Sequence, residues 1–221
     1  VYDPDSPRWG RVRRAVAAKL VSEDLLVVGR WADALRPARA VLGDPLAEIA
    51  RNPRRPEAER FLAINLLTDY TADRPDLLVE LAKEADARAY RVLLPLLRKH
   101  RARAVELMTA ELDRKPAADA SEEARETLAR RQAQAATALL QLGEAGRVWP
   151  LLRHGPDPRV RSWLIHRVGP LGVDPRLLIR RVGEEGDVSA RRALVLCLGA
   201  FNGARLPATR PVAARLLGRY R

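Results

Sequence analysis

The residue types that carry catalysis are few in this chain and stand far apart. A metal site needs several His, Cys or carboxylate ligands at fixed spacing, but each histidine lies without a second His or Cys within reach along a helix; the three are His100, His154 and His166. The carboxylate pairs Glu122-Glu123 and Glu184-Glu185 are adjacent, so on a helix they point in different directions and cannot share a proton as a catalytic dyad does. No Gly-x-Ser-x-Gly turn is present. These patterns predict no enzyme activity, no catalytic residue, no metal and no cofactor.

The single cysteine, Cys197, lies in the apolar run Leu194–Leu198, which predicts a buried small side chain rather than a nucleophile. One cysteine cannot form an internal disulfide, and the chain has neither a run of about 18 apolar residues nor a signal peptide. We therefore expect a soluble, cytoplasmic protein that does not bind membranes. Because the chain opens with Val1 rather than Met, we expect it to be a piece excised from a longer polypeptide.

The chain is strongly basic, with a formal charge of +12, and the charge is unevenly distributed. Residues 1–146 have 25 basic and 23 acidic side chains, whereas residues 147–221 have 15 and 5. Of the 40 basic residues 36 are Arg, in a chain also rich in Ala, Leu, Gly and Pro, which is typical of GC-rich codon usage. Codon usage explains Arg in place of Lys but not the loss of acids. The C-terminal charge therefore favours an acidic or phosphate-bearing partner.

Several C-terminal arginines are spaced so that they could share one surface. In stacked helix pairs the second helix of each pair lines the concave face. Arg176 with Arg180, and Arg215 with Arg219, are i, i+4 pairs, and like charges so placed repel unless an anion lies between them. The predicted basic groove for an acidic protein segment or for phosphates consists of Arg153, Arg176, Arg180, Arg181, Arg215 and Arg219. The alternative is an ordinary solvated face in an Arg-rich protein.

The elements that must position these residues are all predicted to be helices. Apolar residues recur at i, i+3, i+4 and i+7 in segments separated by Pro, Gly and Asp, and no long period-two alternation is present. Expected helices include Pro45–Arg51, which starts at its proline, and Pro211–Tyr220 at the end of the chain. Residues 1–52 lack the internal repeat found in the rest of the chain and are predicted to form a divergent helical cap, with one continuous repeat domain over 53–221.

A short phrase recurs with starts at positions 56, 86, 121, 157 and 187, spaced by 30 to 36 residues. Its best copies are Asp157-Pro-Arg-Val160-Arg161 and Asp187-Val-Ser-Ala190-Arg191. The first residue is expected to cap a helix. The Arg four positions later, Arg161 or Arg191, is expected to reach an acid of the same or the neighbouring unit. The spacing suits one pair of short helices with two turns, which is the size of a solenoid unit.

The last two copies, with Leu164, Val168 and Gly169 after the first and Leu194, Leu198 and Gly199 after the second, resemble the first helix of HEAT repeats. The resemblance is clear over the last two units, weaker over 55–155 and poor before Asn52. It implies a right-handed α-solenoid of about five antiparallel helix pairs, closed at the N-terminal end by the divergent cap.

A narrower resemblance rests on Asp3-Pro-Asp-Ser-Pro-Arg-Trp9, on Glu23–Trp31 with Ala34-Leu-Arg-Pro37, and on Pro156–His166. These segments are similar to the helical repeat segment of large bacterial multidomain proteins that join a serine/threonine kinase domain to a formylglycine-generating-enzyme-like (sulfatase-modifying-factor) domain. Because the kinase motifs and paired metal-binding cysteines are missing here, the resemblance implies a spacer and docking scaffold whose partner is another protein or a neighbouring domain of the same polypeptide.

The alternative function is binding of nucleic acid. Some HEAT-like solenoids of this length are DNA glycosylases that use Trp and Asp in a basic groove, and Trp31-Ala-Asp33 is the nearest such combination here. However, Trp31 belongs to an apolar stripe, and the other tryptophans have no carboxylate at the same offset, which favours packed Trp side chains. The leading prediction is therefore a non-catalytic protein-interaction scaffold.

Overall fold

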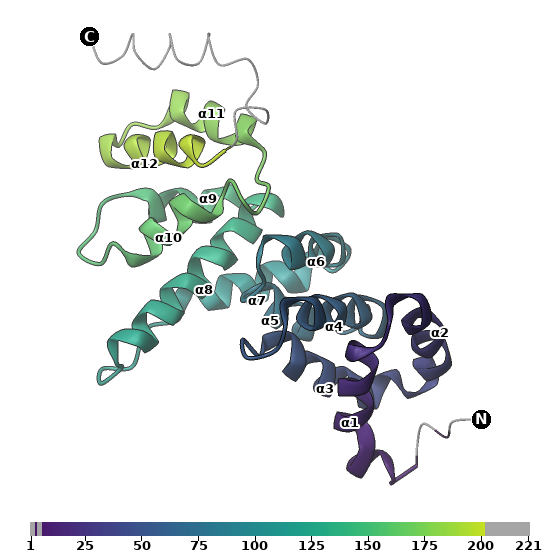
Figure 1. The fold of residues 1–221 in the computed structure, drawn as a ribbon. Helices are drawn as coiled ribbons and strands as arrows, with labels where there is room; N and C mark the ends of the chain where they lie inside the picture. Colours follow the sequence, from purple (N-terminus) through teal and green to yellow (C-terminus); the bar gives the residue numbers. More distant parts are fainter. Residues whose placement is uncertain (1–2, 4–5, 202–221) are drawn as a thin grey trace. The chain divides into compact units, whose positions relative to one another are not determined.

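The structure, a computed structural model, describes residue 3 and residues 6–201, and all regular elements in this part of the chain are helical. The predicted all-α class is confirmed. The chain divides into two compact units, Val1–Ala104 and Val105–Arg221, with the boundary inside helix α7 (Figure 1). The described α-helices are α1 Trp9–Ser22, α2 Leu25–Leu35, α3 Arg39–Arg51, α4 Glu57–Tyr70, α5 Pro75–Ala82, α6 Ala87–Lys99, α7 Arg101–Asp113, α8 Glu122–Gln141, α9 Ala145–Val148, α10 Arg159–Arg167, α11 Pro175–Glu184 and α12 Val188–Gly199.

The recurring phrase opens α4, α6, α8, α10 and α12, as predicted. At α12 the Asp187 carboxylate accepts a hydrogen bond from the N–H of Ala190 (2.8 Å), and Ser121 does the same for α8. Such caps satisfy N–H groups that have no partner within the helix and each stabilise it by about 1 kcal/mol. The Asp157 carboxylate accepts from the N–H of Arg159 just before α10 forms its first turn.

The expected role of the phrase's arginines is wrong in one respect. Arg161 does not bind a carboxylate, because its Nε donates to the carbonyl oxygen of Leu152 (2.9 Å) and its Nη2 to that of Ser189 (3.1 Å). Arg191 donates to the carbonyl oxygen of Glu185. Spacing placed both arginines one turn after the cap, but their acceptors are the backbone carbonyl oxygens of Leu152, Ser189 and Glu185, which lie at the ends of neighbouring helical segments.

The helix expected to start at Pro45 begins at Arg39 instead, after a short 3₁₀ turn, Arg36–Ala38. A proline inside a helix costs one hydrogen bond. Here Leu42 and Leu46, one turn apart on α3, are fully buried, and this burial offsets the loss. The helix predicted at Pro211–Tyr220 lies outside the described residues.

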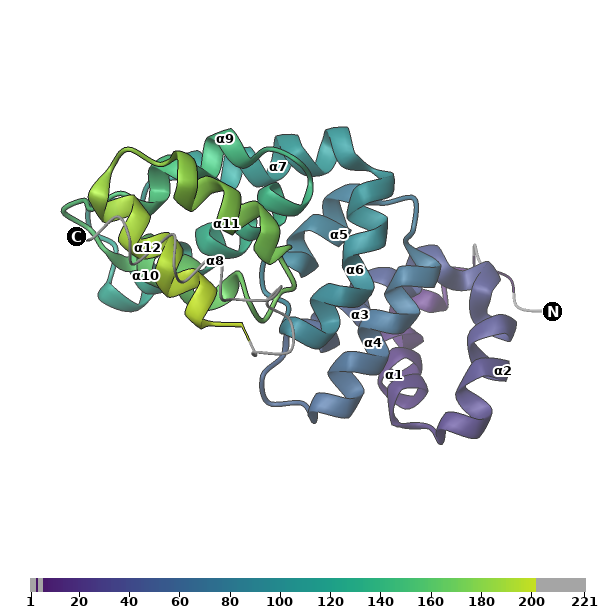
Figure 2. The ribbon, with the colours of Figure 1, turned by 90° about the horizontal axis from the view of Figure 1, so that it is seen from above.

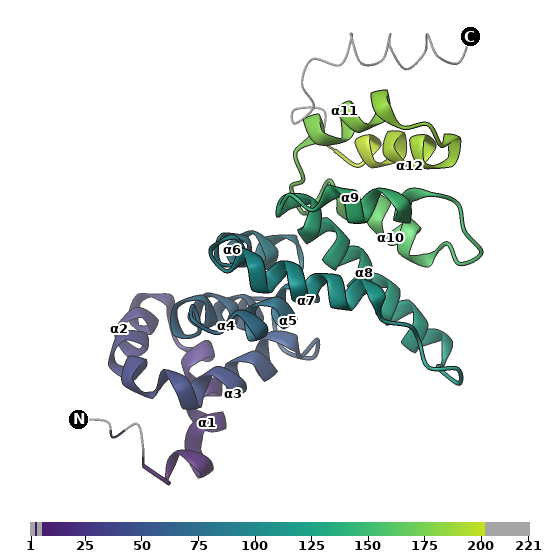
Figure 3. The same cartoon turned by 180° about the vertical axis from the view of Figure 1, so that it is seen from behind.

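In unit 1, α4 packs against α1, α3 and α6 (Figures 1 and 3). Its last residue, Tyr70, is buried, and the Tyr70 hydroxyl donates to the carbonyl oxygen of Ala32 at 2.7 Å. Burial raises the pKa of Tyr70 to about 12, so this hydrogen bond persists at neutral pH. This contact fixes the C-terminal end of α2 on the core. The ion pair between Arg36, directly after α2, and Asp69 of α4 holds the same end in place.

In unit 2, α8 is the central helix. Every residue from Gln132 to Leu140 is buried, so neighbouring elements cover all its faces. The Gln132 amide nitrogen lies 2.8–3.2 Å from the carbonyl oxygens of Glu111 and Leu112 at the end of α7 and of Arg114 just after it, and so caps this helix end. The helix α10 packs along α8, and α11 lies beside α12 (Figure 2).

Candidate interaction sites

The described part of the predicted basic groove separates into two groups. Arg176 and Arg180 are exposed, one turn apart on α11, and within the described residues neither side chain has a hydrogen bond or ion pair. Arg153 is also exposed and follows the short 3₁₀ turn Trp149–Leu152. Arg181, in contrast, turns inward. The remaining predicted members, Arg215 and Arg219, lie outside the described residues.

Arg181 belongs to a structural cluster around Glu185. Its Nε and Nη2 lie 3.1 and 2.6 Å from Glu185 Oε2, and its guanidinium lies over the Trp149 ring at 5.6 Å. Glu185 is only 4% exposed, and its other oxygen accepts from the N–H of Asp187 (2.9 Å). That N–H first, then Arg181 and the charge of Arg153, hold the pKa of Glu185 below its usual value. The spacing of Arg180 and Arg181 could not show that only one of the two reaches solvent.

A separate site, which the sequence analysis did not predict, is an apolar cleft of about 820 Å³ in unit 1. It follows α1 and is closed on one side by the C-terminal half of α2. Its apolar lining residues are Trp9, Val12, Ala15, Val16 and Leu20 of α1 with Trp31 and Leu35 of α2, and its polar ones are Asp3, Ser6, Arg8, Lys19 and Glu23.

The cleft exists because α1 has two apolar faces and only one of them is fully covered. Ala17 and Val21 are buried where α1 packs against α3 and α4. Val12, on the other face, is 43% exposed, and Trp31 across the cleft is 47% exposed. The i, i+3, i+4 stripe in α1 was visible in the sequence, but which face has a neighbour depends on where α2 lies.

Trp31, which was expected to be a packed cap or core side chain, is instead half-exposed at the cleft. Tyr70 and Arg36 hold the end of α2 such that Ala32 and Leu35 face the core, and Trp31 is left at the cleft. Asp33, the acid of the glycosylase-like combination, is exposed and pairs with Arg36 at 3.2 Å. The structure therefore places Asp33 in a solvent-exposed ion pair and not in a buried acidic site.

Two further candidate groups, Cys197 and His100, are held in the structure, whereas His154 and His166 are exposed. Cys197 is fully buried as predicted, and burial raises the pKa of its thiol to about 12. His100 Nε2 lies 2.6 Å from the carbonyl oxygen of Ala72. No group of three or more His, Cys, Asp or Glu that could hold a metal ion occurs in the described part of the chain.

Comparison with known proteins gives no assignment. No family model, curated protein or solved structure matches this chain. None of the helices within the described residues is long and apolar enough to span a membrane.

Proposed function

We propose that this chain is a non-catalytic protein-interaction scaffold, and the observation that carries the proposal is the apolar cleft along α1. A contiguous exposed apolar surface is costly in water and marks an interaction site. Tryptophan is enriched among residues that contribute most to protein–protein binding, and Trp9 and Trp31 both line this cleft. Its length, set by the 14 residues of α1, is about 21 Å at 1.5 Å per residue. That length matches three to four turns of a bound helix.

The occupant we infer is an amphipathic helix of a partner protein with acidic residues beside its apolar face. The helix α1 carries four basic residues and no acid. Arg11 is exposed and Arg13 is partly exposed, and neither has an ion pair within the described residues, while Arg14 and Lys19 pair with Glu48 and Glu23. A second copy of the same surface would bring two cationic helices together, which is unfavourable. An acidic helix in an apolar groove satisfies both the charge and the shape.

The finer architecture remains part of the proposal: a right-handed HEAT-like solenoid with residues 1–52 as a cap and 53–221 as repeats. It is supported by the capped starts of α6, α8 and α12, by the recurrence of the phrase at the starts of α4 and α10, and by the packing of α4 with α6 and of α8 with α10. Such an array spaces the domains of a larger polypeptide and presents its surfaces to partners.

The experiment is a selection from a displayed library of random helical peptides. Peptides are enriched on the wild-type chain alone and then tested for binding to a Trp31→Ala variant, with a Leu26→Ala variant as the matched control. Leu26 is 89% exposed on the same helix but does not line the cleft. We expect the enriched sequences to have large apolar residues at i, i+3 or i+4, and i+7, with Asp or Glu beside them. Peptides that bind Trp31→Ala equally well contradict the proposal.

The second candidate function is binding of nucleic acid, favoured by Arg176 and Arg180, which are exposed and have no side-chain partner in the part of the chain that the structure describes. Anisotropy of labelled duplex and single-stranded oligonucleotides, at low and physiological salt, tests it with an Arg176→Glu, Arg180→Glu variant. Phosphate binding must weaken steeply with salt and disappear in this variant. Binding that the two changes leave intact removes this candidate.

A further inference from the structure

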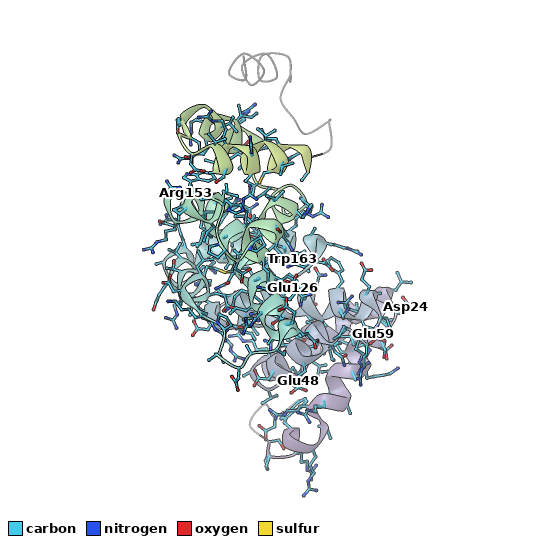
Figure 4. All side chains as sticks on the ribbon, turned by 90° about the vertical axis from the view of Figure 1, so that its left-hand side faces the viewer. Asp24, Glu48, Glu59, Glu126, Arg153 and Trp163 are labelled. Carbon is cyan, nitrogen blue, oxygen red and sulfur yellow. The ribbon has the colours of Figure 1, made fainter. Side chains whose placement is uncertain are left out.

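The facing sides of α8 and α10 form a ladder of polar contacts in unit 2. At the first rung, Arg159 Nη2 lies 2.5 Å from Glu122 Oε1. At the second, the Trp163 indole N–H donates to Glu126 Oε1 at 2.5 Å (Figure 4). Residue numbers rise together on both helices, so the helices run parallel and each rung lies one turn beyond the last.

The third rung has no acid. One turn beyond Trp163, α10 presents Arg167, and one turn beyond Glu126, α8 presents Arg130 where the pattern would place a carboxylate. The Arg167 guanidinium donates to the side-chain oxygen of Gln134 at 2.7 Å, which is its only hydrogen bond within the described residues. No described carboxylate pairs with Arg130 or Arg167. The two arginines therefore bring two positive charges to one end of the ladder.

The environment of Arg167 makes this arrangement costly without an anion. Its side chain is half-buried, and desolvation, with a smaller contribution from the charge of Arg130, lowers its pKa. A guanidinium remains protonated at every physiological pH, so it cannot relieve the cost by losing its proton. An unpaired, partly buried charge is stabilised by a counter-ion that enters the site.

The guanidinium is also held in position before any ligand arrives. It lies over the Trp163 ring at 5.4 Å, and the Trp163 indole is itself fixed by Glu126. Of the five N–H donors of Arg167, Gln134 takes one. The others are available in the planar fork that matches the oxygens of phosphate.

We propose that Arg130 and Arg167 form a binding site for one phosphoryl group carried by a phosphorylated side chain of a partner protein. Two guanidinium groups match the nearly double negative charge of such a phosphate at neutral pH. Glu122 and Glu126 lie on the same ladder and repel a polyanion that would continue along it, which disfavours a nucleic acid backbone. The site lies on different helices from the apolar cleft and does not depend on it.

The test follows the Trp163 indole N–H signal by NMR, assigned with a Trp163→Phe variant, as a short glycine and serine peptide with one phosphoserine is added. We expect a saturable shift of this signal. The affinity for the phosphopeptide should be at least about tenfold weaker in Arg130→Gln, because one charge-assisted contact is lost. Arg192→Gln is the matched control, since Arg192 is an exposed arginine on α12. It should bind as the wild type does.

Three results overturn the proposal. The first is no shift of the Trp163 signal up to about 10 mM phosphopeptide, a concentration that would detect even millimolar affinity. The second is equal binding of the unphosphorylated peptide or of the Arg130→Gln variant. The third is tighter binding of inorganic phosphate or of an oligonucleotide than of the phosphopeptide, which would assign the site to a free anion or to nucleic acid. None of these results bears on the cleft, whose own test uses Trp31.

Discussion

At the scale of single residues, Glu185 shows how one carboxylate can stabilise a junction between helices. One of its oxygens binds the Arg181 side chain, the other binds the N–H of Asp187, and its backbone carbonyl accepts from Arg191. Asp187 in turn caps α12. The side chain of Glu185 thus joins the end of α11 to the start of α12.

We predict that Glu185→Ala destabilises the chain by about 2 kcal/mol, because it leaves the Arg181 charge and the Asp187 N–H without their acceptor. Glu184→Ala, at an exposed neighbouring position, should change the free energy of unfolding by less than about 0.5 kcal/mol. Urea unfolding of both variants measures the difference. Equal stability of the two variants would show that the cluster contributes nothing.

The sequence could predict residue types at this scale but not their partners. Cys197 was correctly expected to be buried, since the surrounding run is apolar. Arg181 and Glu185 are an i, i+4 pair, and Arg180 and Glu184 have the same spacing; which of the two pairs is buried depends on the rotation of α11 against the 3₁₀ turn that carries Trp149. A contact between segments about 30 residues apart leaves no local pattern in the sequence.

At the scale of elements, helix starts were predicted well where Asp or Ser caps them, because the cap is a local interaction. The start of α3 was missed because it depends on burial of Leu42 and Leu46, which is a tertiary effect that outweighs the cost of Pro45. Tertiary contacts also decide how α1 is covered, because its second apolar face lines a cleft and not a core.

Close packing of the segment after α10 gives a prediction at this scale. A Cβ added at Gly169 would lie 2.6 Å from the carbonyl oxygen of Ala200, a backbone atom that cannot easily move. We therefore expect Gly169→Ala to destabilise the chain by about 1–3 kcal/mol through overpacking.

The matched control is Gly183→Ala in α11, where an added Cβ meets nothing within 4 Å. This change should stabilise the chain by up to about 1 kcal/mol, because alanine has the higher helix propensity. Thermal unfolding of the two variants should therefore give shifts of opposite sign. A destabilised Gly183→Ala or an unchanged Gly169→Ala would contradict the packing described for unit 2.

At the scale of the whole molecule, carboxylates are scarce in the part of the chain after residue 146. The excess of basic over acidic residues after residue 146 leaves few carboxylates there, and most of them are used as caps or ion-pair partners. Each of those carboxylates therefore matters more to stability than in a chain with balanced charge.

This gives a prediction for the pH dependence of stability. Hydrogen bonds from Arg159, Asp187 and Ser189 lower the pKa values of Asp157, Glu185 and Asp187 respectively. A carboxylate whose folded pKa is lowered stabilises the fold fully above its unfolded pKa, and this stability is lost as the pH falls through the folded pKa. The melting temperature should therefore be constant near neutral pH and fall below about pH 4. A melting temperature that rises on acidification would contradict this assignment.

The most direct test of the interaction role is the affinity of one library-selected acidic helical peptide for three forms of the chain, measured by isothermal titration calorimetry. We predict that Trp31→Ala weakens binding by at least about tenfold, or 1.4 kcal/mol, whereas Leu26→Ala binds within about twofold of the wild type. Equal affinity of the wild type and Trp31→Ala would contradict the claim that the cleft along α1 is the binding surface.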